Sequence, residues 1–153
     1  MISKEYECCF KVKDCKPFID YCISNGYTKT KECYQVREIF RGDGFIARIT
    51  TDDENGKITQ SLDFKEDKRT GELIIVRKES KEMPITDLEA ALSILEFLNL
   101  KKDNVVKRNR VVYECGDVKF EIDDYFSGEF VIAIEGESSK VDAIYNVVKE
   151  FCN

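Results

Sequence analysis

The chain has 153 residues, of which 42% are hydrophobic and 35% are charged, and its formal net charge is −6 at pH 7. This composition suits a globular chain, and we expect a single domain over residues 1–153. The acidic balance argues against nucleic acid as a partner, since proteins that bind it usually carry a basic excess. No long apolar segment or signal-peptide pattern is present, so we expect a soluble, cytoplasmic protein with no membrane partner.

Seven cysteines and the absence of histidine limit the chemistry that this chain can carry out. No two cysteines have C-x-x-C spacing, so neither a disulfide framework nor a zinc site is expected. Cys9 has no base near it in the sequence, and we interpret it as a passive thiol. Without histidine, catalysis would depend on carboxylates, Lys, Tyr, Cys or a metal-bound water.

Polar and apolar residues alternate over residues 4–13, which predicts a strand with Glu5 and Glu7 on its polar face. A helix is predicted next, with Asp14 as its N-cap. Asn25-Gly26 should end this helix, because glycine readily adopts the left-handed conformation found after helix ends.

The middle of the chain predicts strands over residues 33–40, 45–51, 57–65 and 72–81. Asn55-Gly56 is a strong signal for a tight hairpin between two of them. Residues 66–71 are predicted to form a polar loop. A helix is predicted over residues 86–100, where Thr86 and Glu89 have the spacing of a capping box.

Three further strands are predicted within residues 106–137, followed by a helix from about residue 139. Glu137 would favour the N-terminus of this last helix by its charge. The expected order, β-α-β-β-β-β-α-β-β-β-α, predicts an antiparallel sheet in the α+β class. Eight such strands can close into an antiparallel β-barrel with the three amphipathic helices packed outside.

Each of these strands places its charged residues on one face, because alternate side chains point the same way. The basic members are Lys11, Arg37, Arg48, Lys65, Arg77, Arg108 and Arg110. The acidic members are Glu5, Glu7, Glu79, Glu121, Asp123 and Glu135. These faces are either the solvated side of an ordinary sheet or the inner side of a barrel. A mixture of both charges suits a complex of Mg²⁺ with a triphosphate, since carboxylates hold the metal and arginines the phosphates.

Four segments together resemble the CYTH domain, the triphosphate tunnel group that includes class IV adenylate cyclases and thiamine triphosphatases. EYECC at residues 5–9 resembles the E-x-E-x-K signature of that family. RNR at residues 108–110, followed by Tyr113, resembles its basic-x-Arg strand. FEID at 120–123 and AIEGES at 133–138 resemble its last two strands.

The resemblance implies an eight-stranded antiparallel β-tunnel that binds a triphosphate-containing small molecule with Mg²⁺ or Mn²⁺. Its implied metal ligands are Glu5, Glu7 and Glu135. Its implied phosphate ligands are Arg48, Lys65, Arg77, Arg108 and Arg110. Lys65 and Asp123 are the expected catalytic residues, with metal ligation as the alternative role of Asp123. A homodimer is left open.

Three departures from the family pattern bear on activity. Cys9 stands where the signature has Lys, and Lys11 on the same face lies about 7 Å further along the strand. Ile46 replaces a frequent Arg, and Ala133 replaces a frequent Glu. Fewer charged groups would weaken both the metal site and the activation of a nucleophile.

Three functions remain open from the sequence. The first is a metal-dependent enzyme that hydrolyses a triphosphate or cyclises ATP to cyclic AMP. The second is a protein that keeps the tunnel and binds polyphosphate or nucleotide without turnover. The third is an unrelated α+β interaction domain whose charges face water, in which Lys119 and Glu121 would form an ordinary surface pair.

Overall fold

The computed structural model describes residues 2–68 and 71–152. Its strands are β1 Ile2–Val12, β2 Thr28–Arg41, β3 Phe45–Glu54, β4 Lys57–Glu66, β5 Ile74–Ser80, β6 Met83–Pro84, β7 Lys101–Cys115, β8 Val118–Asp124 and β9 Phe130–Glu135. Its helices are α1 Lys16–Ser24, α2 Leu88–Phe97, α3 Ser138–Val148 and the short 3₁₀ helix η1 Lys149–Cys152.

The strands form one hydrogen-bonded sheet in the order β3-β2-β7-β8-β9-β1-β5-β4-β6. A further pairing joins β3 to β4, so the eight longer strands pair in a closed ring and the two-residue β6 lies beside β4. The pairs β1–β9, β2–β3, β3–β4, β7–β8 and β8–β9 are all antiparallel. The predicted α+β fold with an eight-stranded antiparallel β-barrel is therefore confirmed.

The chain divides into two compact units, each assembled from separate stretches of sequence. Unit 1 comprises Met1–Lys4, Tyr34–Arg69 and Arg77–Lys107. Unit 2 comprises Glu5–Cys33, Thr70–Val76 and Arg108–Asn153. The strands β1, β2, β5 and β7 contribute residues to both units. The single domain expected over residues 1–153 stays a prediction.

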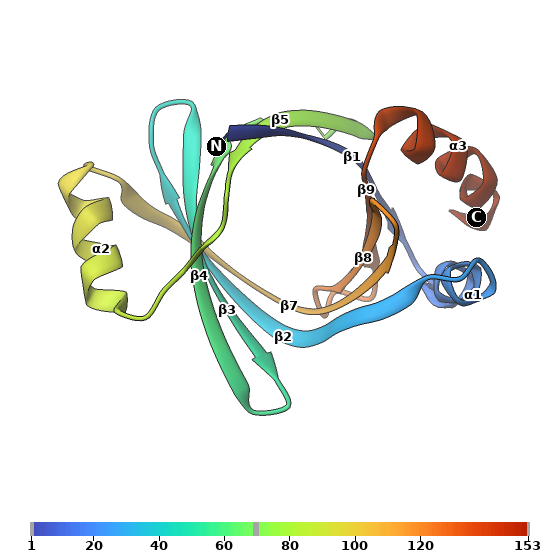
Figure 1. The fold of residues 1–153 in the computed structure, drawn as a ribbon, viewed down its shortest axis with the longest axis horizontal. Coiled ribbons are helices and arrows are strands. Elements are labelled where there is room, and N and C mark those ends of the chain that lie inside the picture. The colour runs from blue at the N-terminus through green and yellow to red at the C-terminus, as the bar shows by residue number, and fades with distance from the viewer. Residues whose placement is uncertain (1, 69–70, 153) are drawn as a thin grey trace. The chain divides into compact units, whose positions relative to one another are not determined.

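The apolar core of unit 2 lies between its strands and the helices α1 and α3. Phe18 of α1 and Val141 of α3 are fully buried in the same cluster as Cys8, Phe120 and Ile134 of the strands. Figure 1 shows both helices on the same side of β1 and β9. The helices therefore cover one face of these strands and leave the other face to the polar side chains.

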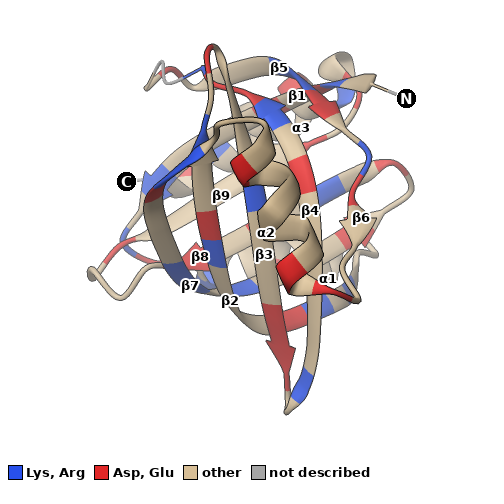
Figure 2. Cartoon of the chain, turned by 90° about the vertical axis from the view of Figure 1, so that its left-hand side faces the viewer, with Lys and Arg blue, Asp and Glu red and all other residues tan. Residues whose placement is uncertain are grey.

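The apolar core of unit 1 lies beneath α2. Leu95 of α2 is buried against Ile49 of β3, Leu62 of β4 and Phe40 of β2. Figures 1 and 2 both show α2 lying across β3 and β4. The alternate residues of β3 and β4 face away from this helix, and that face carries Arg48 and Lys65.

The predicted turn signals are confirmed at two places. Asn55 and Gly56 have φ of 54° and 89° and join β3 to β4 between the paired residues Glu54 and Lys57. Positive φ at both central residues is what a tight hairpin turn requires. Gly26, with φ of 77°, follows the C-cap Asn25 of α1.

Two predicted helix caps are wrong by one residue. Asp87 caps α2 in place of Thr86, and its carboxylate accepts a hydrogen bond from Ala90 N at 3.0 Å. Aspartate both accepts this bond and places negative charge at the positive end of the helix. Cys15 caps α1 in place of Asp14, which instead accepts from Lys16 N at 3.0 Å. Glu137, expected to favour the start of the last helix by its charge, is the N-cap of α3, and its side chain accepts hydrogen bonds from Ser139 N and Lys140 N.

The predicted strand boundaries differ most in β2 and β7, which begin five residues earlier than the patterns at 33 and 106 indicated. The early part of β7 is polar on both faces, so alternation could not reveal it. It lies in the sheet beside β2, and two side-chain pairs accompany this backbone pairing: Lys102 donates to Glu38 at 2.7 Å, and Arg41 Nη2 donates to Asp103 at 2.8 Å. Part of the predicted loop at 66–71 lies outside the described residues.

Candidate functional site

The polar face of β7 and β8 is buried in unit 2. The exposed fraction is 5% for Arg108, 9% for Arg110 and 3% for Asp123. Along β8, Phe120 and Ile122 enter the apolar core on one face, while Glu121 and Asp123 are buried on the other. Charges are buried only when they are paired, so this face is a built polar site. The alternative in which these charges face water is wrong for Arg108, Arg110 and Asp123.

Arg110 is held by two carboxylates. Its Nε and Nη2 donate to the two oxygens of Asp123 at 2.7 and 2.9 Å, and its Nη1 donates to Glu121 at 2.8 Å. The register explains this arrangement, because Arg110 lies directly opposite Asp123 in the β7–β8 pair. Burial acts to lower the pKa of Arg110, but Glu121 and Asp123 outweigh it and raise the pKa.

Arg108 is tied to the same carboxylate and to an aromatic ring. Its Nη1 lies 3.6 Å from Asp123 Oδ2 and donates a hydrogen bond to the Tyr125 hydroxyl. The guanidinium carbon lies 5.4 Å from the centre of the Tyr125 ring, within the range of a cation–π contact. Asp123 therefore orients both arginines of this strand.

Lys119 extends the network along β8 to β9. Its Nζ lies 3.1 Å from Glu135 and 3.8 Å from Glu121. Burial acts to lower the pKa of the Lys119 ammonium, but the two glutamates raise it above its usual value, so the ammonium stays charged at neutral pH. The surface pair predicted between Lys119 and Glu121 is thus part of a longer series of ion pairs.

Glu5, Glu7 and Glu135 form an acidic trio in which one carboxylate oxygen from each residue lies within 4.8 Å of the others. Glu7 and Glu135 are direct partners in the β1–β9 register, and Glu5 is two residues along the same strand face. Burial, then Glu121 and Glu5, raise the pKa of Glu135 well above the usual range of a carboxyl. Three close carboxylates with this mutual repulsion fit the oxygen preference of Mg²⁺ or Mn²⁺.

The predicted polar residues of unit 1 are also internally paired. Arg48 forms a two-point ion pair with Asp63, its direct partner across β3 and β4. Lys65, only 5% exposed, has its Nζ 3.7 Å from Glu79 of β5. Polar pairs between β2 and β3 continue this face: Gln35 donates to Asp52 at 2.9 Å, and Arg37 donates to Thr50 at 3.0 Å. Figure 2 shows basic and acidic residues following one another along these strands.

Comparisons of the sequence match no family model and no curated protein. Comparison of the structure finds protein PH1012 from Pyrococcus horikoshii OT3, with 20% identity, a TM-score of 0.71, and coverage of 95% of this chain and 88% of that chain. A Vibrio parahaemolyticus protein proposed to be an adenylate cyclase has 12% identity, a TM-score of 0.71, and coverage of 96% and 87%. A Bacillus halodurans protein with the same proposed activity has 17% identity, a TM-score of 0.53, and coverage of 97% and 90%.

The chain has the CYTH-type fold. The ring of antiparallel strands and these structural neighbours agree on it. Within this fold, unit 2 brings together most of the predicted site residues, namely Glu5, Glu7, Arg108, Arg110, Asp123 and Glu135. Unit 1 contains the predicted phosphate ligands Arg48, Lys65 and Arg77.

Sequence reasoning missed the contacts that Lys119, Tyr125 and Asp63 make with the predicted site residues. Asp63 shares its strand face with Lys65, so alternation alone could have included it. Tyr125 follows the end of β8, beyond the alternating pattern. Its contact with Arg108 of β7 depends on the path that the chain takes after β8.

The Cys9 thiol of β1 is a poor nucleophile. Burial, followed by the nearby carboxylates of Glu7 and Asp123, raises its pKa to about 12. The passive role predicted for Cys9 agrees with this shift, because only the thiolate attacks. No disulfide joins the seven cysteines, all of which lie in the described ranges. Over residues 2–68 and 71–152, no helix has the length and apolar character needed to cross a membrane.

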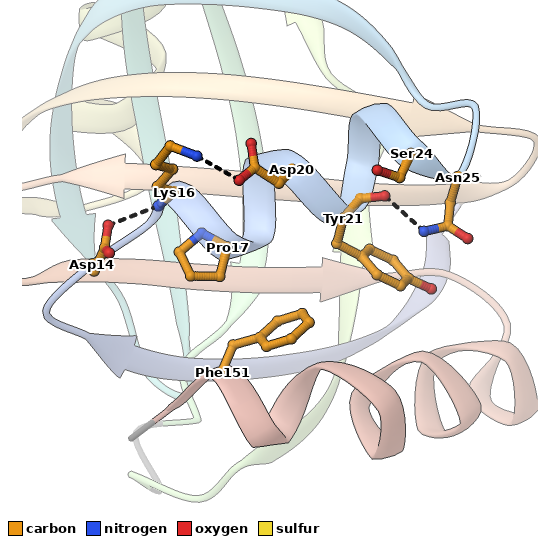
Figure 3. Close-up of a pocket in the computed structure, with 8 residues that line it drawn as sticks. All are labelled: Asp14, Lys16, Pro17, Asp20, Tyr21, Ser24, Asn25 and Phe151. Atoms are coloured by element: carbon orange, nitrogen blue, oxygen red, sulfur yellow. Dashed lines mark hydrogen bonds and ion pairs between the residues drawn. The ribbon is translucent and has the colours of Figure 1, made fainter.

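A separate cavity of about 480 Å³ lies between α1 and the C-terminal η1 in unit 2 (Figure 3). The rings of Tyr21 and Phe151 line it, while Lys16 and Asp20 at its edge pair with each other at 2.7 Å. None of the residues predicted for metal or phosphate lines this cavity. It therefore plays no part in the site built by β1, β7, β8 and β9.

Proposed function

We propose that this chain binds a triphosphate compound together with Mg²⁺ or Mn²⁺ and hydrolyses its terminal phosphate. The observation that carries the proposal is the acidic trio Glu5, Glu7 and Glu135, joined by ion pairs through Lys119 to the buried Arg110 in one compact unit. Partly buried carboxylates joined to buried arginines suit a ligand that combines a divalent cation with phosphate.

Glu5, Glu7 and Glu135 would hold the divalent cation. A metal bound there would neutralise phosphate charge and lower the pKa of a coordinated water. With all groups ionised, the acidic trio, Glu121 and Asp123 carry five negative charges against three positive ones on Arg108, Arg110 and Lys119. The acidic excess among these side chains supports a divalent cation as part of the ligand.

Arg108 and Arg110 would contact the phosphates. Three of the five N–H donors of Arg110 are used by Asp123 and Glu121, so the guanidinium can donate further while it remains fixed. Such fixed donors stabilise the charge that develops during phosphoryl transfer. Asp123 would act here by positioning the two arginines, and we propose this role in preference to proton transfer.

The proposed roles of Arg48, Lys65 and Arg77 in unit 1 rest on the family resemblance. Arg48 is paired with Asp63 and Lys65 with Glu79, so each would contact phosphate while its carboxylate partner stays close. Substituting each residue separately and measuring tripolyphosphate affinity tests these roles without any assumption about how the two units are arranged.

The deciding experiment is product release by the purified protein. Tripolyphosphate, thiamine triphosphate and ATP would be offered with Mg²⁺ or Mn²⁺, and inorganic phosphate and cyclic AMP measured. We expect phosphate release that is lost in Glu5→Gln and Glu135→Gln and kept in Glu32→Gln, an exposed pair partner of Lys29. Cyclic AMP from ATP would instead select the activity proposed for two of the structural neighbours.

Binding without turnover is the second candidate, and one observation favours it. Cys9 and Ala133 are direct partners in the β1–β9 register, and Ala133 is also the partner of Glu121. The two positions where the family usually has Lys and Glu are therefore neighbours, and both lack a charged group. Tight tripolyphosphate binding with no product from any of the three compounds would establish this candidate.

A further inference from the structure

The ion pairs of unit 2 form one continuous series across β9, β8 and β7. Glu135 contacts Lys119, Lys119 contacts Glu121, Glu121 contacts Arg110, and Arg110 contacts Asp123. In their ionised forms, these groups alternate in sign at every step. The series begins at a carboxylate of the acidic trio and ends at the arginines proposed to contact phosphate.

Lys119 occupies a special place in this series because of the sheet register. Its β8 position is opposite Glu135 of β9, and Glu135 is opposite Glu7 of β1. The side chains of these three partners lie on the same face of neighbouring strands. The ammonium at 3.1 Å from Glu135 therefore already provides positive charge to the trio that would hold a divalent cation.

An ammonium and a divalent cation compete for the same carboxylate. Like charges a few ångströms apart repel strongly where solvent screening is weak, and Glu135 is only 15% exposed in its side chain. A cation bound by Glu135 would weaken the ion pair between Glu135 and Lys119. The displaced ammonium would be left beside Glu121 and Arg110, where a phosphate group is the complementary partner.

We propose that Lys119 is an internal counter-cation that neutralises the acidic trio without metal, lowers metal affinity, and becomes a phosphate ligand when the metal binds. The inference rests on the proposed function, because it takes the trio as the metal site. It gives the trio a positively charged neighbour in a chain whose signature segment has Cys9 in place of Lys.

Lys119→Met tests the inference, because methionine keeps the unbranched length and removes the charge. Titration calorimetry with Mn²⁺ should give a dissociation constant at least about tenfold lower than in the wild type, since the competing charge is gone. Tripolyphosphate with saturating Mn²⁺ should bind about tenfold more weakly, since a phosphate ligand is gone. Opposite shifts for the two ligands separate this role from a purely structural one, which would weaken both.

Two variants serve as controls. Lys140→Met removes an exposed lysine of the same unit, paired with Asp117 at 2.9 Å, and should leave both affinities within about twofold of the wild type. Lys119→Arg keeps the positive charge and should restore weak Mn²⁺ binding. Without metal, Lys119→Met should unfold at lower temperature than Lys140→Met, and saturating Mn²⁺ should remove most of that difference.

The outcomes distinguish this inference from the proposed function. Mn²⁺ affinity that is unchanged or weaker in Lys119→Met overturns the inference, while Mn²⁺ binding by the wild type leaves the metal site in place. No Mn²⁺ binding by either protein overturns both. If Lys119→Met does not fold, the ¹⁵N signals of the wild-type lysine ammonium groups decide: the Lys119 signal should move on adding Mg²⁺, and an unmoved signal overturns the inference.

Discussion

Arg110 and Arg41 show how burial changes the contribution of an ion pair to the stability of the folded protein. Arg110 is buried with Asp123 and Glu121, whereas Arg41 pairs with Asp67 and Asp103 at a more exposed position. Removing one partner of a buried ion pair leaves the other charges without compensation. Exposed pairs contribute little, because water screens them.

We therefore expect Arg110→Ala to lower the free energy of unfolding by about 3–5 kcal/mol. Arg41→Ala, as the control, should change it little. Urea unfolding followed by circular dichroism measures both. Equally small effects of the two substitutions would mean that the ion pairs of Arg110 do not stabilise the folded protein. For tests of phosphate affinity, Arg110→Lys is the better variant because it keeps the charge.

Glu135 makes stability depend on pH in the absence of metal. Because its pKa is raised in the folded protein, the folded state holds a proton that the unfolded state releases above about pH 4.3. This contribution is fully present below that pH and is lost as pH rises through the raised pKa. Unfolding measured in a chelator from pH 5 to 9 should show falling stability, and Glu135→Gln should flatten the slope. An unchanged slope would contradict the assignment.

At the residue scale, alternation predicted which side chains share a face, but not which of them pair. Glu5, Glu7 and Glu135 were grouped by family resemblance, and the structure places their carboxylates together. The partner of Lys119 depends on the register of β8 against β9, which no single strand encodes. The partners in each ion pair could therefore be identified only from the structure.

At the scale of elements, the start of α2 can be tested with two neighbouring residues. Asp87 accepts the capping hydrogen bond from Ala90, whereas Thr86 precedes the cap. We expect Asp87→Ala to lower the free energy of unfolding by about 1 kcal/mol, and Thr86→Ala to have a much smaller effect. Thermal or urea unfolding measures the difference. The reverse order would show that the helix begins one residue earlier.

Elements with strong local signals were predictable, and elements held by distant partners were not. The β3–β4 hairpin follows from Asn55-Gly56, whose conformation is local. β7 is hydrogen-bonded to β2 in the sheet, and this backbone pairing with a strand far away in the sequence gives its first residues their strand conformation. Their own polar sequence gives no strand signal, so this boundary depends on tertiary contacts.

At the scale of the whole molecule, metal binding should stabilise the folded chain. A cation that binds only the folded state adds about 2.7 kcal/mol at a free concentration 100 times its dissociation constant. Thermal unfolding with increasing Mn²⁺ should show this rise in the wild type and in Glu32→Gln. A double variant, Glu5→Gln with Glu135→Gln, should lose it. Equal stabilisation of all three proteins would place the metal elsewhere.

The pairing of β1 with β9 has a consequence for synthesis of the protein. Glu7 is made well before its partner Glu135, because most of the sequence lies between them. At a translation rate of about 5–20 residues per second, β1 is made roughly ten seconds before β9, its partner in the sheet. During that interval Cys8 and Phe18, which are fully buried in the finished protein, remain uncovered. The nascent chain should therefore expose this apolar face until β9 has left the exit tunnel.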